Sequence, residues 1–192
     1  METLAPELVI AAYRRGYFPM AEPGSGEIGW YRTARRAVFL PGDAHVSRSL
    51  NRVLKQERFQ VAINRDFGAV IAACARRDET WISAAIISCY SVLHENGIAH
   101  SVEAYNDGRL VGGLYGVALG GAFFGESMFH HLPDASKVAF ATLCRRLDER
   151  GFLLHDAQFM TPHLARLGAR EVFEPAYLRL LREALRVPCR FA

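Results

Sequence analysis

The chain has 192 residues, of which 51% are hydrophobic and 22% charged, with a formal net charge of +3. This length suffices for one good hydrophobic core plus a small additional region, so we expect a soluble globular protein. Its apolar runs are interrupted well before the roughly 20 residues that a membrane helix needs, which predicts no membrane span. The first residues lack the basic and then apolar order of a signal peptide, so we expect a cytoplasmic protein.

Basic residues crowd the first third of the chain: Arg14, Arg15, Arg32, Arg35, Arg36, Arg48, Arg52, Lys55 and Arg58. This asymmetry suits a polyanionic partner, although a solvated basic helix face would give the same pattern. The four cysteines are far apart and lack the spacing of metal ligands, so we interpret them as buried thiols rather than catalytic groups.

Apolar periodicity and turn residues predict alternating helices and strands along the chain. In chain order we expect helix 4–15, strand 37–40, helix 46–56, strand 59–63, helices 66–77 and 84–96, strands 100–105, 109–119 and 122–128, a helix between 133 and 151, strand 152–157, helix 162–167, a short strand around 172 and helix 175–186. The three consecutive strands should form an antiparallel meander. This order predicts an α+β protein with a mixed, mostly antiparallel central sheet flanked by helices.

Polar side chains on two of the apolar strands indicate a site. Glu126 should share a strand face with Phe124 and Met128, and a buried carboxylate is costly unless it meets a cation or hydrogen-bond donors. A structural salt bridge, for example to Lys137, is the alternative. Asp156 and Gln158 are two residues apart on the next predicted strand, so their side chains should point the same way; a turn cap and a satisfied polar neighbour are the alternative.

The sequence resembles the leucyl/phenylalanyl-tRNA-protein transferases in motifs over nearly its whole length: AAYRRGYFP, SRS, TWI, AHSVE, LVGGLYGVALG, GESMF, ASK, DAQ and HLARLGA. The resemblance implies transfer of Leu or Phe, and less readily Met, from aminoacyl-tRNA to proteins that begin with Arg or Lys. The product then carries a destabilising N-terminal residue, which commits it to N-degron degradation. A tRNA-binding or adaptor module of the same fold without transfer activity is the alternative.

The order of elements also resembles the N-acyltransferase (GNAT) architecture. We expect a small N-terminal region at residues 1–33 and an N-acyltransferase-like catalytic domain at 34–192. A coenzyme A enzyme would be expected to carry a glycine-rich loop before the helix that follows its central strands. The corresponding segment here, HHLPDASK, has no glycine, so no cofactor is expected.

The family resemblance also implies roles for the polar residues. Asp156 would hold Gln158, whose carbonyl oxygen orients the attacking amine, and Glu126 with Asp156 would form the acidic pocket for the acceptor. An amide is a feeble base and a tRNA ester is already activated, so positioning should matter more than proton abstraction. Arg48, Arg52 and Lys55 share one helix face and are expected to contact tRNA phosphates, with Arg76 and Arg77 behind them.

The pocket for the donor side chain is implied to be lined by Met20, Trp81, Leu114, Phe123, Leu143 and His155. Met20 stands where the family usually has Trp, and His155 stands where it usually has an aliphatic residue. These two departures leave the donor preference open. Phe123 and Glu126 should lie on opposite faces of a regular strand, and a bulge near Gly125 would let both reach one site.

His130 and His131 suggest a competing hypothesis, in which they bind a metal together with His155 or Asp156. Adjacent strand residues point to opposite faces, which makes joint ligation awkward. We therefore expect no metal site.

Overall fold

The computed structural model describes residues 4–77 and 80–192. Within these residues the helices are α1 (Pro6–Tyr13), α2 (Arg48–Lys55), α3 (Phe67–Ala75), α4 (Ala84–Glu95), α5 (Ala135–Glu149), α6 (Pro162–Arg166) and α7 (Glu174–Ala184). The strands are β1 (Phe18–Ala21), β2 (Ile28–Tyr31), β3 (Arg35–Phe39), β4 (Gln60–Ile63), β5 (Ala99–Asn106), β6 (Arg109–Leu119), β7 (Ala122–His130), β8 (Leu154–Asp156) and β9 (Arg170–Phe173).

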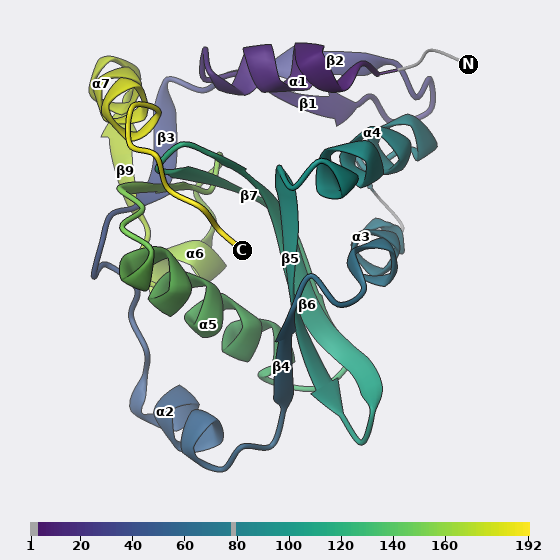
Figure 1. The fold of residues 1–192 in the computed structure, drawn as a ribbon, viewed down its shortest axis with the longest axis vertical. Coiled ribbons are helices and arrows are strands. Elements are labelled where there is room, and N and C mark those ends of the chain that lie inside the picture. The colour runs from purple at the N-terminus through teal and green to yellow at the C-terminus, as the bar shows by residue number, and fades with distance from the viewer. Residues whose placement is uncertain (1–3, 78–79) are drawn as a thin grey trace.

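A seven-stranded sheet in the order β4-β5-β6-β7-β8-β3-β9 forms the centre of the fold (Figure 1). All neighbouring strands are antiparallel except β7 and β8, which run parallel. The predicted α+β class with a mixed, mostly antiparallel sheet is confirmed, and so is the meander of β5, β6 and β7. Every predicted helix and strand is present, with ends displaced by no more than two residues.

The sheet is covered on both faces by helices. Strand alternation sends Leu114 toward α5, where it packs with Leu143, and sends Tyr115 toward α3 and α4, where it packs with Tyr90. Helix α2 packs on the α5 side through Leu50 and Val53. Helices α1, α3 and α4 lie on the opposite face, as Figure 1 shows.

The small sheet of β1 and β2 was not predicted. Its register pairs Phe18 with Tyr31 and Pro19 with Trp30. Pro19 cannot donate to a ladder and Gly and Pro residues fill the connecting turn, so the segment lacks a regular strand pattern. This hairpin gains its order from packing, since Phe18, Met20 and Trp30 all contribute to the core beneath α1 and α4.

The predicted bulge is present in β7. Tyr115 pairs with Ser127 and Gly116 with Gly125, so Glu126 is the additional residue and has no partner on β6. A Cβ atom on Gly116 would lie 2.3 Å from the Phe124 carbonyl oxygen, so this close approach requires glycine. The bulge also reverses the alternation that follows it.

Glu126 lies on the face of Phe124, as predicted, but as a consequence of the bulge Met128 does not. Met128 packs with Phe123 in the cluster beneath α5, whereas Phe124 belongs to the cluster around Tyr13. An extra residue in a strand shifts every later side chain to the other face, and regular alternation could not show this.

Helix α1 shares the core of the main sheet. Val9 and Tyr13 are fully buried and belong to the same cluster as Tyr90 and Phe124. The division into residues 1–33 and 34–192 therefore stays a prediction, and residues 1–3 of that first region lie outside the described residues.

Cys74, Cys89 and Cys144 are buried free thiols and Cys189 is half-buried. Burial raises the pKa of both Cys74 and Cys144 to about 12, which opposes a catalytic role.

In the part of the chain that the structure describes, no helix has the length and apolar character to cross a bilayer.

Candidate active site

The sheet opens between β7 and β8. The two strands pair only as far as Phe124 and Asp156, and β7 then continues to His130 while β8 ends. Two neighbouring cavities of about 260 Å³ and 190 Å³ lie beside this opening. They share the lining residues Trp81, Glu126, Ala157, Gln158, Thr161 and Leu164. A site with two adjoining compartments can hold two substrates against each other.

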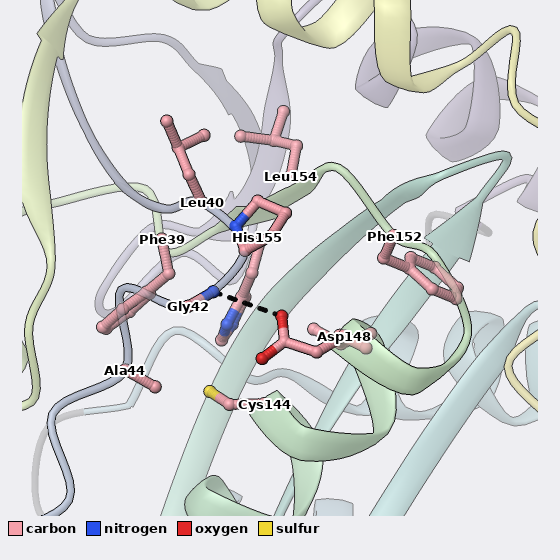
Figure 2. Close-up of a pocket in the computed structure, with 11 residues that line it drawn as sticks. Phe39, Leu40, Gly42, Ala44, Cys144, Asp148, Phe152, Leu154 and His155 are labelled. Atoms are coloured by element: carbon pink, nitrogen blue, oxygen red, sulfur yellow. Dashed lines mark hydrogen bonds between the residues drawn. The ribbon is translucent and has the colours of Figure 1, made fainter.

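A third hollow, of about 20 Å³, lies behind His155 and is shown in Figure 2. Phe39, Cys144 and Phe152 contribute to its wall. Its volume is enough for about one water molecule. It is therefore too small to be a substrate site.

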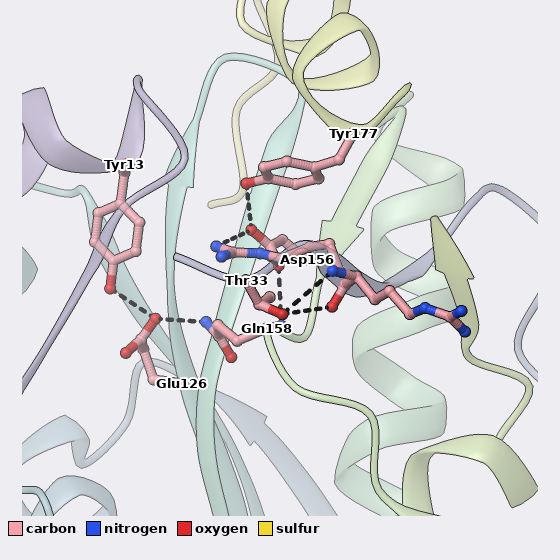
Figure 3. Close-up of polar contacts among 8 residues, drawn as sticks. Tyr13, Thr33, Glu126, Asp156, Gln158 and Tyr177 are labelled. Atoms are coloured by element: carbon pink, nitrogen blue, oxygen red, sulfur yellow. Dashed lines mark hydrogen bonds and ion pairs between the residues drawn. The ribbon is translucent and has the colours of Figure 1, made fainter. Parts of the chain in front are cut away.

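Asp156 is fully buried and receives four hydrogen bonds. Arg36 donates from Nε to Oδ1 and from Nη2 to Oδ2, each at 2.8 Å, and the Tyr177 hydroxyl donates to Oδ2 at 2.6 Å. The backbone N–H of Gln158 donates to Oδ1 at 2.9 Å. Figure 3 shows Asp156 between Tyr177 and Gln158. Asp156 lines neither cavity, so the structure does not bring it to an acceptor as the resemblance implied.

Arg36 completes a buried ion pair with Asp156. Its guanidinium lies within 5 Å of the ring centres of both Phe18 and Tyr177. Burial by itself would lower the pKa of Arg36, but the Asp156 carboxylate outweighs it and raises that pKa above its ordinary value. The interpretation of Arg36 as part of a basic surface is therefore wrong, because its side chain is only 1% exposed.

Gln158 follows β8 in a left-handed backbone conformation, with φ at 56°. The strand ends at Asp156, so the two side chains do not share a strand face, and that prediction is wrong. Instead, the Asp156 carboxylate and the Ala37 N–H bind the backbone of Gln158, the latter donating to its carbonyl at 3.0 Å. The Gln158 side chain is thereby directed into the wall shared by the two cavities.

Glu126 accepts hydrogen bonds from three side chains. The Tyr13 hydroxyl donates to Oε1 at 2.6 Å, the Gln158 amide to Oε1 at 3.1 Å and the Tyr90 hydroxyl to Oε2 at 3.3 Å. Figure 3 shows Glu126 between Tyr13 and Gln158. Burial raises the pKa of Glu126 to about 7; the Tyr13 hydrogen bond opposes this shift, and the Asp156 carboxylate adds to it. Within the described residues Glu126 forms no ion pair, and Lys137 pairs with Asp134.

Four of the six residues implied for the donor pocket line the larger cavity, namely Trp81, Leu114, Leu143 and His155. Met20 lines the smaller one, beside Trp81 and Phe18. Phe123 lines neither: it is fully buried, and its ring lies nearly perpendicular to that of His155 at a centroid distance of 5.6 Å. Met128 and Phe140 complete the apolar wall of the larger cavity.

A family model described as leucyl/phenylalanyl-tRNA protein transferase matches residues 38–182, and the model of that family's N-terminal domain matches residues 2–33. The chain belongs to the leucyl/phenylalanyl-tRNA protein transferase family. Membership makes it an aminoacyltransferase, as predicted.

Curated members of the family match almost end to end. A leucyl/phenylalanyl-tRNA–protein transferase of Rubrobacter xylanophilus is 57% identical over 98% of this chain and 99% of its own length. The transferase of Prosthecochloris aestuarii is 53% identical over 92% of this chain and 93% of its own length. That of Gloeobacter violaceus is 51% identical over 98% of this chain and 98% of its own length.

Among solved structures, L-PGS from Bacillus licheniformis shares the fold with a TM-score of 0.53. It is 12% identical and covers 94% of this chain and 70% of its own. A ribosomal-protein-alanine N-acetyltransferase from Brucella melitensis matches at 19% identity, over 49% of this chain and 74% of its own, with a TM-score of 0.38 that adds nothing to the fold assignment.

In this transferase, several polar residues at the site were not singled out from the sequence. Tyr13 stands in the motif AAYRRGYFP, but an apolar helix pattern gave no reason to separate it from the core. Tyr90 and Tyr177 have the same ambiguity, because a buried tyrosine looks like any other core aromatic until a partner for its hydroxyl is known. Arg77 was placed behind the basic helix, whereas it lines the larger cavity and donates to the Met128 carbonyl.

The predicted tRNA-contacting residues Arg48, Arg52 and Lys55 are all exposed on α2. Ser47 caps this helix by accepting from the Leu50 N–H at 3.2 Å. Arg76 and Arg77 follow α3, which packs on the other face of the sheet from α2. They do not extend the α2 surface.

His130 and His131 are exposed at the end of β7. Their supposed co-ligands are engaged elsewhere, since Asp156 is bound by Arg36 and the His155 ring stacks on Phe39 at a centroid distance of 5.1 Å. Across residues 4–77 and 80–192, no group of three or more His, Cys, Asp or Glu is arranged to hold a metal ion.

Proposed function

We propose that the protein transfers Leu or Phe, and less readily Met, from aminoacyl-tRNA to the N-terminal Arg or Lys of acceptor proteins. The observation that carries this proposal is the pair of adjoining cavities. The larger is lined by Leu114, Met128 and Leu143 and suits an apolar donor side chain, while Glu126 stands in the shared wall as the anion for a basic acceptor. The donor ester and the acceptor amine then meet beside Gln158.

In the reaction the acceptor's α-amine attacks the ester carbonyl carbon. The new C–N bond forms as the C–O bond to the terminal ribose breaks, and the ribose oxygen leaves with a proton. The Gln158 amide nitrogen is bound by Glu126, so its carbonyl oxygen is the atom that can accept an N–H of the amine. Asp156 acts as a positioning residue that fixes the Gln158 backbone. A tRNA ester is already activated, so alignment of the amine supplies the main gain.

Glu126 suits a cationic acceptor because of its environment. With a pKa of about 7 it is only partly ionised near neutral pH, and its ionised form needs a nearby cation to offset its burial. An incoming guanidinium or ammonium supplies that cation and favours the carboxylate. Tyr13 and Tyr90 hold Glu126 in place through their hydroxyls.

The test of this function is transfer of labelled Leu, Phe or Met from charged tRNA to peptides that begin with Arg or Lys. Product with Leu or Phe is expected, and peptides that begin with an acidic residue should stay unmodified. Absence of product with every donor would contradict the enzymatic proposal and favour the binding-module alternative, which no observation on this chain supports. The cytoplasm, where charged tRNA is used, is the compartment that fits both substrates.

We expect α2 to bind tRNA phosphates. The double change Arg52→Glu with Lys55→Glu should weaken tRNA binding at every salt concentration, and should reduce the slope of log affinity against log salt by about 2, because two phosphate contacts are lost. The measurement is tRNA affinity over a series of salt concentrations.

A matched control is the double change Arg179→Glu with Arg182→Glu. These two arginines are exposed on α7 with the same spacing of three residues, and α7 and α2 lie at opposite ends of the molecule in Figure 1. The control makes the same change in net charge but should leave the slope unaltered. Equal slopes for the two double variants would mean that α2 does not contact the tRNA.

A further inference from the structure

His155 is an imidazole held within an apolar wall. It is 7% exposed, and its ring packs against Phe39, Phe123 and Phe140 at centroid distances of 5.1, 5.6 and 5.9 Å. The strand register explains these contacts, because His155 pairs with Phe39 on β3 and with Phe123 on β7. Its side chain lies on the α5 face of the sheet, opposite Asp156.

The far nitrogen of this ring borders the larger cavity. A Cβ atom on Gly125 would lie 2.7 Å from Nε2 of His155, and both residues line that cavity. Leu114, Phe140 and Leu143, which belong to the apolar cluster beneath α5, contribute hydrocarbon to the wall of the same cavity. Nε2 is therefore a polar atom within the apolar part of the cavity wall, whereas Arg77, Gln158 and Thr161 line other parts of the same cavity.

The surroundings of the ring select one tautomer. Burial lowers the pKa of His155 to about 4, so the imidazole is neutral near pH 7 and carries a single N–H. Nδ1 is shielded from solvent and has no hydrogen-bond partner among the described residues. A buried N–H without an acceptor is disfavoured more than an unused lone pair, so the proton resides on Nε2. The N–H of His155 is thus a hydrogen-bond donor in the part of the cavity wall formed by Leu114, Phe140 and Leu143.

We propose that His155 determines donor specificity, with its Nε2–H favouring an aminoacyl side chain that ends in a hydrogen-bond acceptor, so that the protein also uses tyrosine. This inference rests on the proposed function, in which the larger cavity holds the donor side chain. An all-hydrocarbon pocket would leave a phenol hydroxyl without a partner. Here the phenol oxygen can accept from Nε2, whereas a phenyl ring leaves that N–H unpaired.

The experiment compares Tyr with Phe on one tRNA species acylated with either amino acid. The quantity measured is the ratio of kcat/KM for Tyr to that for Phe, with an Arg-terminal peptide as acceptor. Replacement of one hydrogen-bonding partner by a hydrocarbon group should lower this ratio about tenfold in His155→Leu. An unchanged ratio would overturn the proposal, as would transfer of Phe without any transfer of Tyr by the unaltered protein.

Two further variants separate the hydrogen bond from ring packing. The amide nitrogen of Gln can take the place of Nε2, and that of Asn the place of Nδ1. His155→Gln should therefore keep the Tyr-to-Phe ratio within about threefold of that of the unaltered protein. His155→Asn should lower the ratio about tenfold, as His155→Leu does. Equal ratios in the Gln and Asn variants would contradict the role of Nε2.

A measurement on the unaltered protein does not depend on the folding of any variant. Nitrogen NMR of labelled histidine distinguishes the two tautomers, and His155 should show the Nε2–H form at pH 7. The Nδ1–H form would overturn the inference. Failure of the proposed function has a different signature, because then neither Leu nor Phe would be transferred at all.

Discussion

Replacement of Arg36 by methionine is expected to lower the free energy of unfolding by about 3–5 kcal/mol, because it leaves the buried Asp156 carboxylate without its cation. The same change should greatly reduce transfer, since Asp156 holds the backbone of Gln158 at the site. Urea unfolding monitored by circular dichroism measures the first effect, and kcat of surviving folded protein the second.

The neighbouring Arg35 is a matched control. It is 62% exposed in its side chain and pairs with Glu171 at 3.5 Å on the surface. Arg35→Met should change stability by less than about 1 kcal/mol. The double variant Arg36→Met with Asp156→Leu should recover part of the lost stability, because it removes the uncompensated charge. Equal effects of Arg36→Met and Arg35→Met would contradict the buried ion pair.

Replacement of Glu126 by glutamine is expected to reduce kcat/KM for Arg-terminal peptides by about 100-fold, because the acceptor's guanidinium loses its buried anionic partner. The control is a peptide with citrulline in place of Arg, which has nearly the same shape but no charge. The unaltered protein should strongly prefer Arg over citrulline, and Glu126→Gln should lose most of that preference. A preserved preference would place the acceptor's charge away from Glu126.

The same substitution should change how stability depends on pH. The pKa of Glu126 rises from its ordinary value of 4.5 to about 7 on folding, so the folded protein binds this proton more tightly than the unfolded chain. The associated stability, about 3 kcal/mol, is present below pH 4.5 and is lost as pH rises to 7. The Glu126→Gln variant has no carboxyl group at this position, so it does not lose this stability as pH rises. The free energy of unfolding is measured for both proteins at pH 5, 6, 7 and 8. As pH rises, that of the variant should increasingly exceed that of the unaltered protein.

The candidate site was predictable from the sequence only in part. Glu126 and Gln158 stand within distinctive motifs, and the structure brings their side chains within 3.1 Å of each other. The bulge is present as predicted, but it was expected because the resemblance implied a site shared by Phe123 and Glu126, and Phe123 lines neither cavity. The role of Arg36 was not predictable, because it stands among several basic residues that were interpreted as surface residues. Nothing near Arg36 in the sequence indicated a buried partner 120 residues away.

The sequence was equally uninformative about Asp156, the partner of Arg36 in the ion pair. Its position two residues before Gln158 suggested a shared strand face, yet the strand ends there and Gln158 turns into a left-handed conformation. That conformation is stabilised by the Asp156 carboxylate and by Ala37 from β3. A contact with a distant strand cannot be read from local periodicity.

The sequence by itself determined the helices and strands, the β5-β6-β7 meander and the family, because these depend on residue patterns that repeat or recur over short distances. The tertiary structure decided which faces of the strands meet, that Arg36 neutralises Asp156, and that Phe123 supports His155 from behind instead of lining the cavity. It also decided that the hairpin of β1 and β2 forms. These outcomes depend on packing between residues far apart in the chain, whose energy no local pattern records.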